Sequence, residues 1–131
     1  MKSLKRSILE SLGEVIPNFQ QHAELLMAFQ TSVQVYHFAS TIEKFHRQSG
    51  ELYNEIGGLI DRFIEVGSGT NRIDRTKNLP LMSGELMNIL SETLEKTPSI
   101  RADISGRPDL LAILDEFEAV LNKNVYLSTM N

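Results

Sequence analysis

Apolar residues recur at three- and four-residue intervals along four stretches of the chain, and this periodicity constrains the fold more than any other feature. Such spacing places apolar side chains on one face of an α-helix. Four helices that each bury one face predict an all-α four-helix bundle. The four stripes are Leu26, Phe29 and Val33; Phe45, Leu52, Ile56, Leu59 and Phe63; Leu86, Ile89, Leu90 and Leu94; and Leu110, Leu114, Phe117 and Leu121.

Capping and turn-forming residues predict where the first two helices begin and end. The first begins near Asn18, and Ser40 and Glu43 have the spacing of a capping box, which predicts a break and a new helix there. One unbroken helix over 18–48 is the alternative, because no glycine or proline intervenes. The second helix is expected to end at Gly67-Ser68-Gly69, a typical glycine stop.

The second half of the chain contains a long connection and two shorter helices. Residues 67–82 form the expected crossover, which is long enough to contain a short helix of its own. Ser83 is expected to cap the third helix and Thr97-Pro98 to end it, while Pro108 opens the fourth. A short leading helix over about 3–15 completes a single domain, 1–131. The apolar tail Val125-Tyr126-Leu127 is expected to pack back onto the bundle.

Composition excludes several classes of function. The chain has no cysteine, so any bound metal must use histidine nitrogen and carboxylate oxygen, which suits iron, manganese or zinc. A net charge of −4 argues against a nucleic-acid binder. No apolar run approaches the ~20 residues of a membrane span, and no signal-peptide core is present, so we expect no membrane association and a cytoplasmic location.

Two histidines and two acids are the candidate metal ligands: His37, His46, Asp61 and Glu65. Asp61 and Glu65 lie one turn apart, so their carboxylates can bracket one cation. His46 lies about 60° from Asp61 around the helix, but roughly 22 Å away along it. Because ligand bonds are about 2 Å long, these residues can meet only between two antiparallel copies, in an isologous dimer with two identical sites.

Three glycines on the second helix agree with such a dimer. Gly50 and Gly57 lie between His46 and Asp61, with Gly58 beside them, and mid-helix glycine costs ~1 kcal/mol relative to alanine. Close approach of a second backbone would explain them, and a helix kink is the alternative.

Each of these features also has a structural interpretation. An acidic pair at four-residue spacing can be a solvated face, and His37 can be a hydrogen-bonded core histidine. A second metal hypothesis uses Glu43-x-x-His46, the spacing that di-iron bundles place on two helices. The motif occurs once here, so a symmetrical centre within one chain is incomplete.

The spacing of His46, Asp61 and Glu65, with His37 upstream, resembles the Dps branch of the ferritin-like proteins. In that branch two histidines of one subunit and an Asp/Glu pair of its two-fold mate form the ferroxidase centre. The chain departs from this pattern in a shorter interval between the histidines, in Phe38 where tryptophan is usual, and in Gly50 where an acid is common. The segments 36–65 and 109–127 are closer to a family of small, mostly bacteriophage-encoded Dps-like proteins without an established function.

The resemblance implies a ferritin-like four-helix bundle with a crossover segment between the second and third helices. It implies iron at the four candidate ligands, with zinc or manganese as alternatives, and a ferroxidase that oxidises Fe(II) with peroxide or oxygen. The expected assembly is a homo-oligomer, from an antiparallel dimer up to a dodecameric cage. The alternative function is a non-enzymatic phage protein in the host cytoplasm, acting as an interaction, assembly or virion module.

Overall fold

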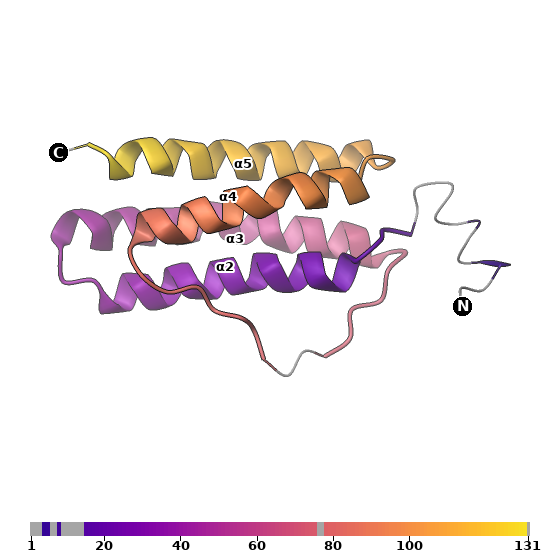
Figure 1. The fold of residues 1–131 in the computed structure, drawn as a ribbon, viewed down its shortest axis with the longest axis horizontal. Helices are drawn as coiled ribbons and strands as arrows, with labels where there is room; N and C mark the ends of the chain where they lie inside the picture. The colour runs from indigo at the N-terminus through magenta and orange to yellow at the C-terminus, as the bar shows by residue number, and fades with distance from the viewer. Residues whose placement is uncertain (1–3, 6–7, 9–14, 76–77, 131) are drawn as a thin grey trace.

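Four α-helices form the body of the protein (Figure 1). The structure, a computed structural model, describes residues 4–5, 8, 15–75 and 78–130. Its helices are α2 (Phe19–Ala39), α3 (Glu43–Ser68), α4 (Leu86–Asp103) and α5 (Pro108–Ser128). The described residues contain no strand, and the predicted all-α four-helix bundle is confirmed.

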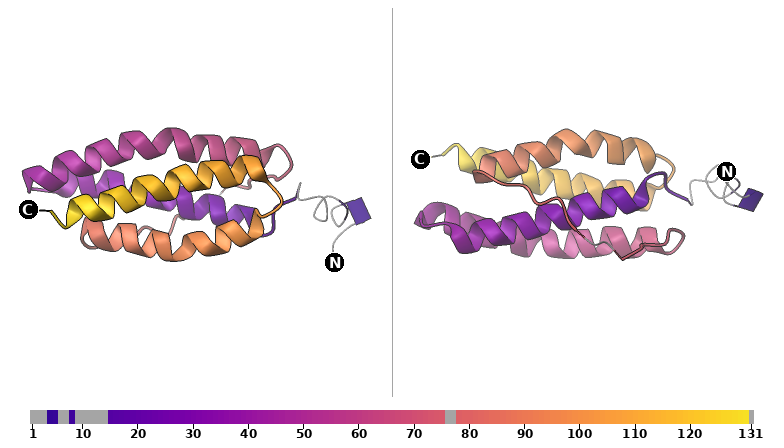
Figure 2. Two further views of the ribbon diagram at one scale, coloured as in Figure 1. Left: turned by 90° about the horizontal axis from the view of Figure 1, so that it is seen from above. Right: turned by 60° about the horizontal axis from the view of Figure 1, so that its bottom comes forward.

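One long connection determines the topology of the bundle. A tight turn joins the antiparallel helices α2 and α3, and α4 and α5 form a second antiparallel pair (Figures 1 and 2). The connection from α3 to α4 runs back along the bundle, so these two helices point the same way. α2 and α5 each pack against both α3 and α4. A single long crossover is the topology of ferritin-like bundles, as the sequence predicted.

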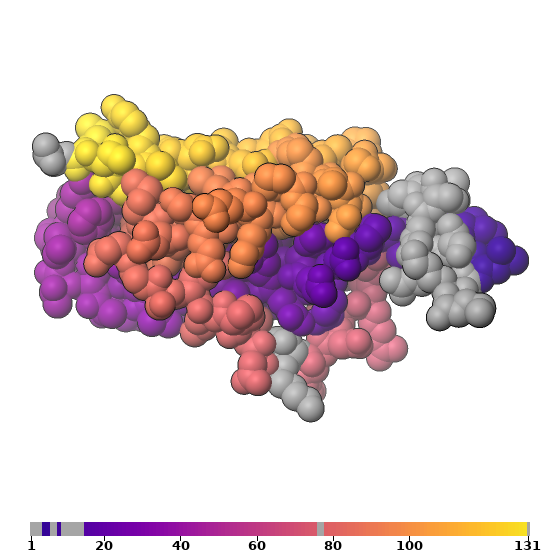
Figure 3. All heavy atoms as spheres, viewed as in Figure 1, coloured from indigo at the N-terminus to yellow at the C-terminus, as the bar shows by residue number. Residues whose placement is uncertain are grey.

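Hydrogen bonds to α2 hold this connection in place. Asp74 and Gln20 form two of them: the Asp74 N–H donates to Gln20 Oε1 at 2.8 Å, and Gln20 Nε2 donates to the Asp74 carbonyl at 3.1 Å. Further along α2, the buried Ser32 hydroxyl accepts the Met82 N–H at 2.8 Å. In the space-filling view the connection lies on the surface beside α2 and the start of α4 (Figure 3).

Two predictions about the connection are wrong. Its described residues, 69–75 and 78–85, contain no helix, so the short helix expected there is absent from them. Ser83 is also not the N-cap of the next helix, because α4 begins at Leu86 with Glu85 in that position.

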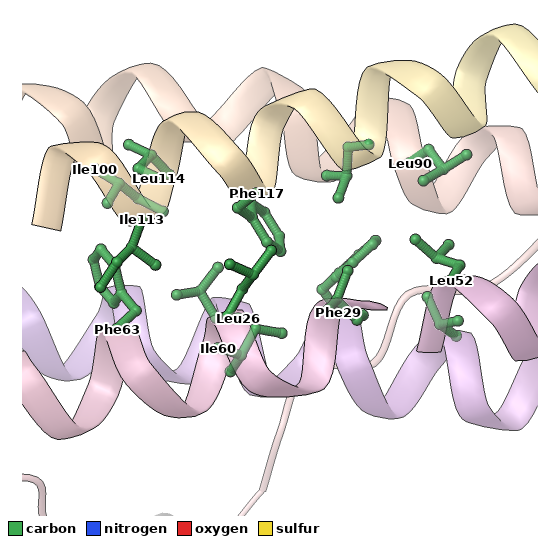
Figure 4. Packing of buried hydrophobic residues seen from close by; sticks show 14 of the residues in the cluster. Leu26, Phe29, Leu52, Ile60, Phe63, Leu90, Ile100, Ile113, Leu114 and Phe117 are labelled. Carbon is green, nitrogen blue, oxygen red and sulfur yellow. The ribbon is translucent and has the colours of Figure 1, made fainter. Parts of the chain in front are cut away.

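The four apolar stripes meet along the axis of the bundle (Figure 4). Phe29 of α2 meets Phe117 of α5 edge to face, with ring centroids 5.6 Å apart, and Phe19 stacks on Phe63 at 6.2 Å. These are favoured geometries for aromatic pairs. All the residues of the predicted stripes are buried except Phe45 and Leu94, which are half-buried.

The turn between α2 and α3 lies where the sequence predicts a break, so the unbroken helix over 18–48 is wrong. The expected capping box does not form, however. Ile42 is the N-cap of α3 and provides no side-chain cap, while Ser40 Oγ donates to the Ile42 carbonyl at 3.4 Å. The Ser40 N–H closes the preceding helix by donating to the Tyr36 carbonyl at 2.9 Å.

α4 continues past Pro98, where the sequence predicted its end, to Asp103. Proline has no N–H to donate to the carbonyl four residues earlier, which here belongs to Leu94. Thr97 Oγ1 lies 3.0 Å from that carbonyl oxygen and 3.0 Å from Glu118 Oε2 of α5, so its single hydroxyl proton is within reach of the carbonyl that lacks a donor and of a carboxylate on the neighbouring helix. Continuing the helix also buries Ile100 completely, which favours the longer helix.

The start of α5 is at Pro108, as predicted. Beside it, the Arg107 guanidinium forms hydrogen bonds of 3.1 and 3.0 Å with the two carboxylate oxygens of Asp109, and this contact lowers the pKa of Asp109 below its usual value. The last turn of α5 contains the expected apolar tail: Val125 packs on the core, whereas Tyr126 is exposed.

The predicted leading helix over 3–15 falls mostly on residues outside the described part of the chain. None of the helices that the structure describes is both long and apolar enough to cross a membrane.

The Thr97 contact gives a stability prediction. Replacing Thr97→Val should lower the free energy of unfolding by ~1–2 kcal/mol, because the Leu94 carbonyl and the Glu118 carboxylate both lose the hydroxyl donor. The same change made together with Pro98→Ala should cost less, since the N–H restored at position 98 can bond to that carbonyl. Chemical denaturation of the four proteins measures both losses, and equal losses in the two backgrounds would contradict this role of Thr97.

Candidate metal centre

The turn between α2 and α3 brings two of the four candidate ligands together. His37 lies in the last turn of α2, and His46 follows the first turn of α3. Because the two helices are antiparallel neighbours, the imidazole rings stack, with centroids 4.1 Å apart and planes inclined by 18°. The two histidines are thus a pair within one chain.

Each histidine is hydrogen-bonded to the backbone of the other. His37 Nδ1 lies 2.7 Å from the His46 carbonyl oxygen, and His46 Nδ1 lies 2.8 Å from the His37 carbonyl oxygen. A carbonyl only accepts, so each Nδ1 carries the proton, and a neutral ring then has its lone pair on Nε2. Neither Nε2 has a hydrogen-bond partner among residues 15–75 and 78–130.

A buried hydroxyl lies against the histidine pair. Ser49 is fully buried and its Oγ donates to the Phe45 carbonyl at 2.7 Å. The same oxygen lies 3.3 Å from His37 Nδ1, so it is a second acceptor for that N–H. The ring of the exposed Phe38 is tilted relative to the His37 ring, with centroids 5.4 Å apart. His37 is therefore held by groups of α3 and lies next to the aromatic ring of its own neighbour.

The two acids lie elsewhere on α3. Asp61 and Glu65 are exposed on its second half, far from the turn at which the histidines meet. Among the residues that the structure describes, no group of three or more metal-ligating side chains comes together. This agrees with the distance argument from the sequence, by which a four-ligand site requires a second copy of the chain.

The second metal hypothesis, a centre built on Glu43 and His46 within one chain, gains no support. The Glu43 side chain is exposed and forms an ion pair with Arg47 at 3.1 Å. α5 has no histidine that could complete a second such motif, and two of its acids are paired with arginines: Asp109 with Arg107, and Asp115 with Arg101.

The stacked geometry limits how the pair can bind an ion. The Nε2 lone pair lies in the plane of its ring, so a ligated ion must lie near that plane at about 2 Å from the nitrogen. The stacked, nearly parallel planes of His37 and His46 do not meet at such a distance. Each imidazole therefore offers its lone pair in a separate plane, and a single ion bound by both requires one ring to turn.

The glycines of α3 have different surroundings. A Cβ at Gly50 would lie 2.9 Å from His37 Cε1, and one at Gly57 would lie 3.6 Å from Gln30 Nε2. Gly50 and Gly57 thus face α2 of their own chain, which differs from the expectation that a second copy approaches them. A Cβ at Gly58 would have no described atom within 4 Å beyond its chain neighbours and the nearby backbone of its own helix.

Side-chain contacts between residues far apart in the sequence were not predicted. His22, which has no acid or histidine three or four residues away, is buried, and its Nε2 lies 2.7 Å from Asp103 Oδ2 of α4. The reciprocal bonds between His37 and His46 use backbone carbonyls, which every residue has, so no residue type in the sequence could have indicated them.

Comparison of the chain with protein-family models, curated protein sequences and solved structures gave no match. The Dps-like resemblance therefore remains a prediction, and the geometry of the histidine pair is the basis for a functional proposal.

Proposed function

We propose that this chain is a Dps-like iron-binding protein that oxidises Fe(II). His37 and His46 of one copy and Asp61 and Glu65 of a second copy are the ligands. The observation that carries the proposal is the imidazole pair, whose Nδ1–H groups both donate to backbone carbonyls. Histidines that ligate metals almost always use their other ring nitrogen in this way, because it fixes the ring and its tautomer.

Two exposed features of α3 support an antiparallel pairing of two copies of this helix: its acidic pair and a glycine on its surface. Asp61 and Glu65 are exposed one turn apart, so a second molecule can reach both carboxylates. Gly58 lies on the exposed surface of the same helix, and among the residues that the structure describes no other part of the chain approaches the position of its missing side chain. Close approach of a second backbone is such an explanation.

The proposed reaction needs an external oxidant. Two Fe(II) ions each lose one electron, and hydrogen peroxide takes up both electrons and two protons to give two molecules of water. Oxygen is the alternative acceptor. The lone pairs of the stacked imidazoles lie in separate planes, so each imidazole holds one of the two ferrous ions, and the carboxylates of the second copy add negative charge that favours the ferric product.

Iron oxidation by mixed variants tests this site. Anaerobic protein loaded with Fe(II) and then given peroxide should form ferric absorbance faster than buffer, and His46→Ala and Asp61→Asn should each abolish the excess rate. A dimer of one His46→Ala chain and one Asp61→Asn chain, purified through two different tags, should regain about half of the activity. This follows because an isologous dimer then retains one intact site of two.

The same experiment separates an inter-subunit site from other possibilities. A mixed dimer as inactive as its parents would contradict ligand sharing between copies. Wild-type oxidation no faster than buffer, unchanged by His46→Ala, would contradict the ferroxidase altogether.

A second candidate function has its own observation. Three large apolar side chains are strongly exposed near the turn between α2 and α3: Val35 is 53% exposed, Phe38 74% and Ile42 56%. Neighbouring exposed apolar side chains are a mark of protein interaction sites. They favour a non-enzymatic bundle that acts as an interaction or assembly module, with the histidine pair as a structural element of the turn.

Metal content and mass in solution discriminate between the two functions. For the iron-binding protein we expect stoichiometric metal after loading and dialysis, and an oligomer with an even number of chains by light scattering. An interaction module should retain no metal, and its binding to a partner should be weakened by Phe38→Ser while its fold is unchanged by circular dichroism.

A further inference from the structure

We propose that Gly50 is the positioning residue of the histidine pair, because the space left by its missing side chain is the space that holds the His37 ring. A Cβ built on Gly50 would lie 2.9 Å from Cε1, 3.2 Å from Nδ1 and 3.6 Å from Nε2 of His37. Real Cβ atoms essentially never approach another heavy atom closer than 3.0 Å. Any other residue at position 50 therefore displaces the ring.

The location of Gly50 accounts for this effect. It follows His46 by one turn of α3, and it therefore lies on the side of that helix that carries the second imidazole. The ring of His37 is thus bounded by the His46 ring, the Ser49 hydroxyl and the bare backbone at Gly50. A glycine within a helix is unfavourable by itself, and here it allows α2 to place an imidazole directly against α3.

Displacing the ring would alter the pair without unfolding the bundle. The atoms that a Cβ would meet are at the far end of the His37 side chain, which is half-buried and can rotate. A rotation that moves the ring away from position 50 would break the 2.7 Å bond from His37 Nδ1 to the His46 carbonyl and the stacking of the rings. The core residues of α3 are on another face of the helix and are unaffected.

This inference rests on the proposed function for its effect on metal binding, but not for its effect on the ring. Groups that orient metal-ligating histidines typically contribute ~10–100-fold to metal affinity. With Co²⁺ as the probe, Gly50→Ala should therefore weaken binding at least ~10-fold. Gly57→Ala is the matched control, because position 57 faces Gln30 of α2 in the same chain and its Cβ would make only an ordinary 3.6 Å contact with Gln30 Nε2.

Nitrogen NMR of the imidazoles provides a readout that a general loss of stability would not change. At alkaline pH the wild-type and Gly57→Ala proteins should show Nδ1 protonated on both His37 and His46. Gly50→Ala should lose this signature for His37, while circular dichroism still reports a folded helical protein. Retention of both Nδ1–H signals in Gly50→Ala, together with unchanged Co²⁺ affinity, would overturn the proposal.

A double variant isolates the contact between Gly50 and the ring. With His37→Ala already present, Gly50→Ala should raise the unfolding midpoint, because alanine favours a helix and nothing remains to clash. With His37 in place, the same change should raise it less or lower it. Equal shifts in the two backgrounds would show that Gly50 does not act through His37.

The two proposals can fail separately. A wild-type protein that binds no Co²⁺ would contradict the proposed function, while the NMR signature and the double variant would still establish the placement of His37 by Gly50. Normal Co²⁺ binding with no change of the His37 signals in Gly50→Ala would contradict the role of Gly50 and leave the metal site standing.

Discussion

The last backbone carbonyls of an α-helix have no hydrogen-bond partner within the helix, and a packed bundle must provide donors for them. In this chain, polar side chains do so at two helix ends. His46 Nδ1 donates to the carbonyl of His37 in the last turn of α2. At the end of α3, Asn71 Nδ2 donates to the Gly67 carbonyl at 2.9 Å, and Asn71 itself is buried. The turns at the ends of the bundle therefore depend on particular side chains beyond the apolar core.

The hydrogen bond from His46 Nδ1 to the His37 carbonyl is also the basis of the candidate metal site. Because the carbonyl accepts from Nδ1, the His46 ring is fixed in the tautomer that leaves Nε2 free, and the reciprocal bond does the same for His37. A structural role for these histidines and a metal-binding role are therefore compatible. What distinguishes the two is whether carboxylates from another molecule reach the turn.

The crossover connection determines what surface is available for such a contact. It runs along α2 on the outside of the bundle, where Gln20 and Ser32 bind it. α3 has α2 and α5 as its main neighbours, and its remaining face carries exposed Asp61 and Glu65. The exposed apolar residues Phe38 and Ile42 lie at the turn beside the histidines. A second copy that packs on this face of α3 would contact the exposed acids, and a partner that packs on the turn would contact the exposed apolar side chains beside the histidines.

The sequence by itself determined the four helices, their apolar faces and the long crossover. Each helix has apolar residues at three- and four-residue spacing, a pattern that can be recognised without knowing how the helices pack. It also showed that His46 and Asp61 are too far apart to share an ion in one molecule, since the rise of a helix is fixed. Only the tertiary structure decided the course of α4 beyond Pro98 and the use of Gly50. In the first case a threonine hydroxyl lies between a carbonyl without a backbone donor and a carboxylate of α5, and in the second an imidazole from another helix fills the space of an absent side chain. Both depend on directional contacts at distances of about 3 Å, which a one-dimensional pattern of residue types does not encode.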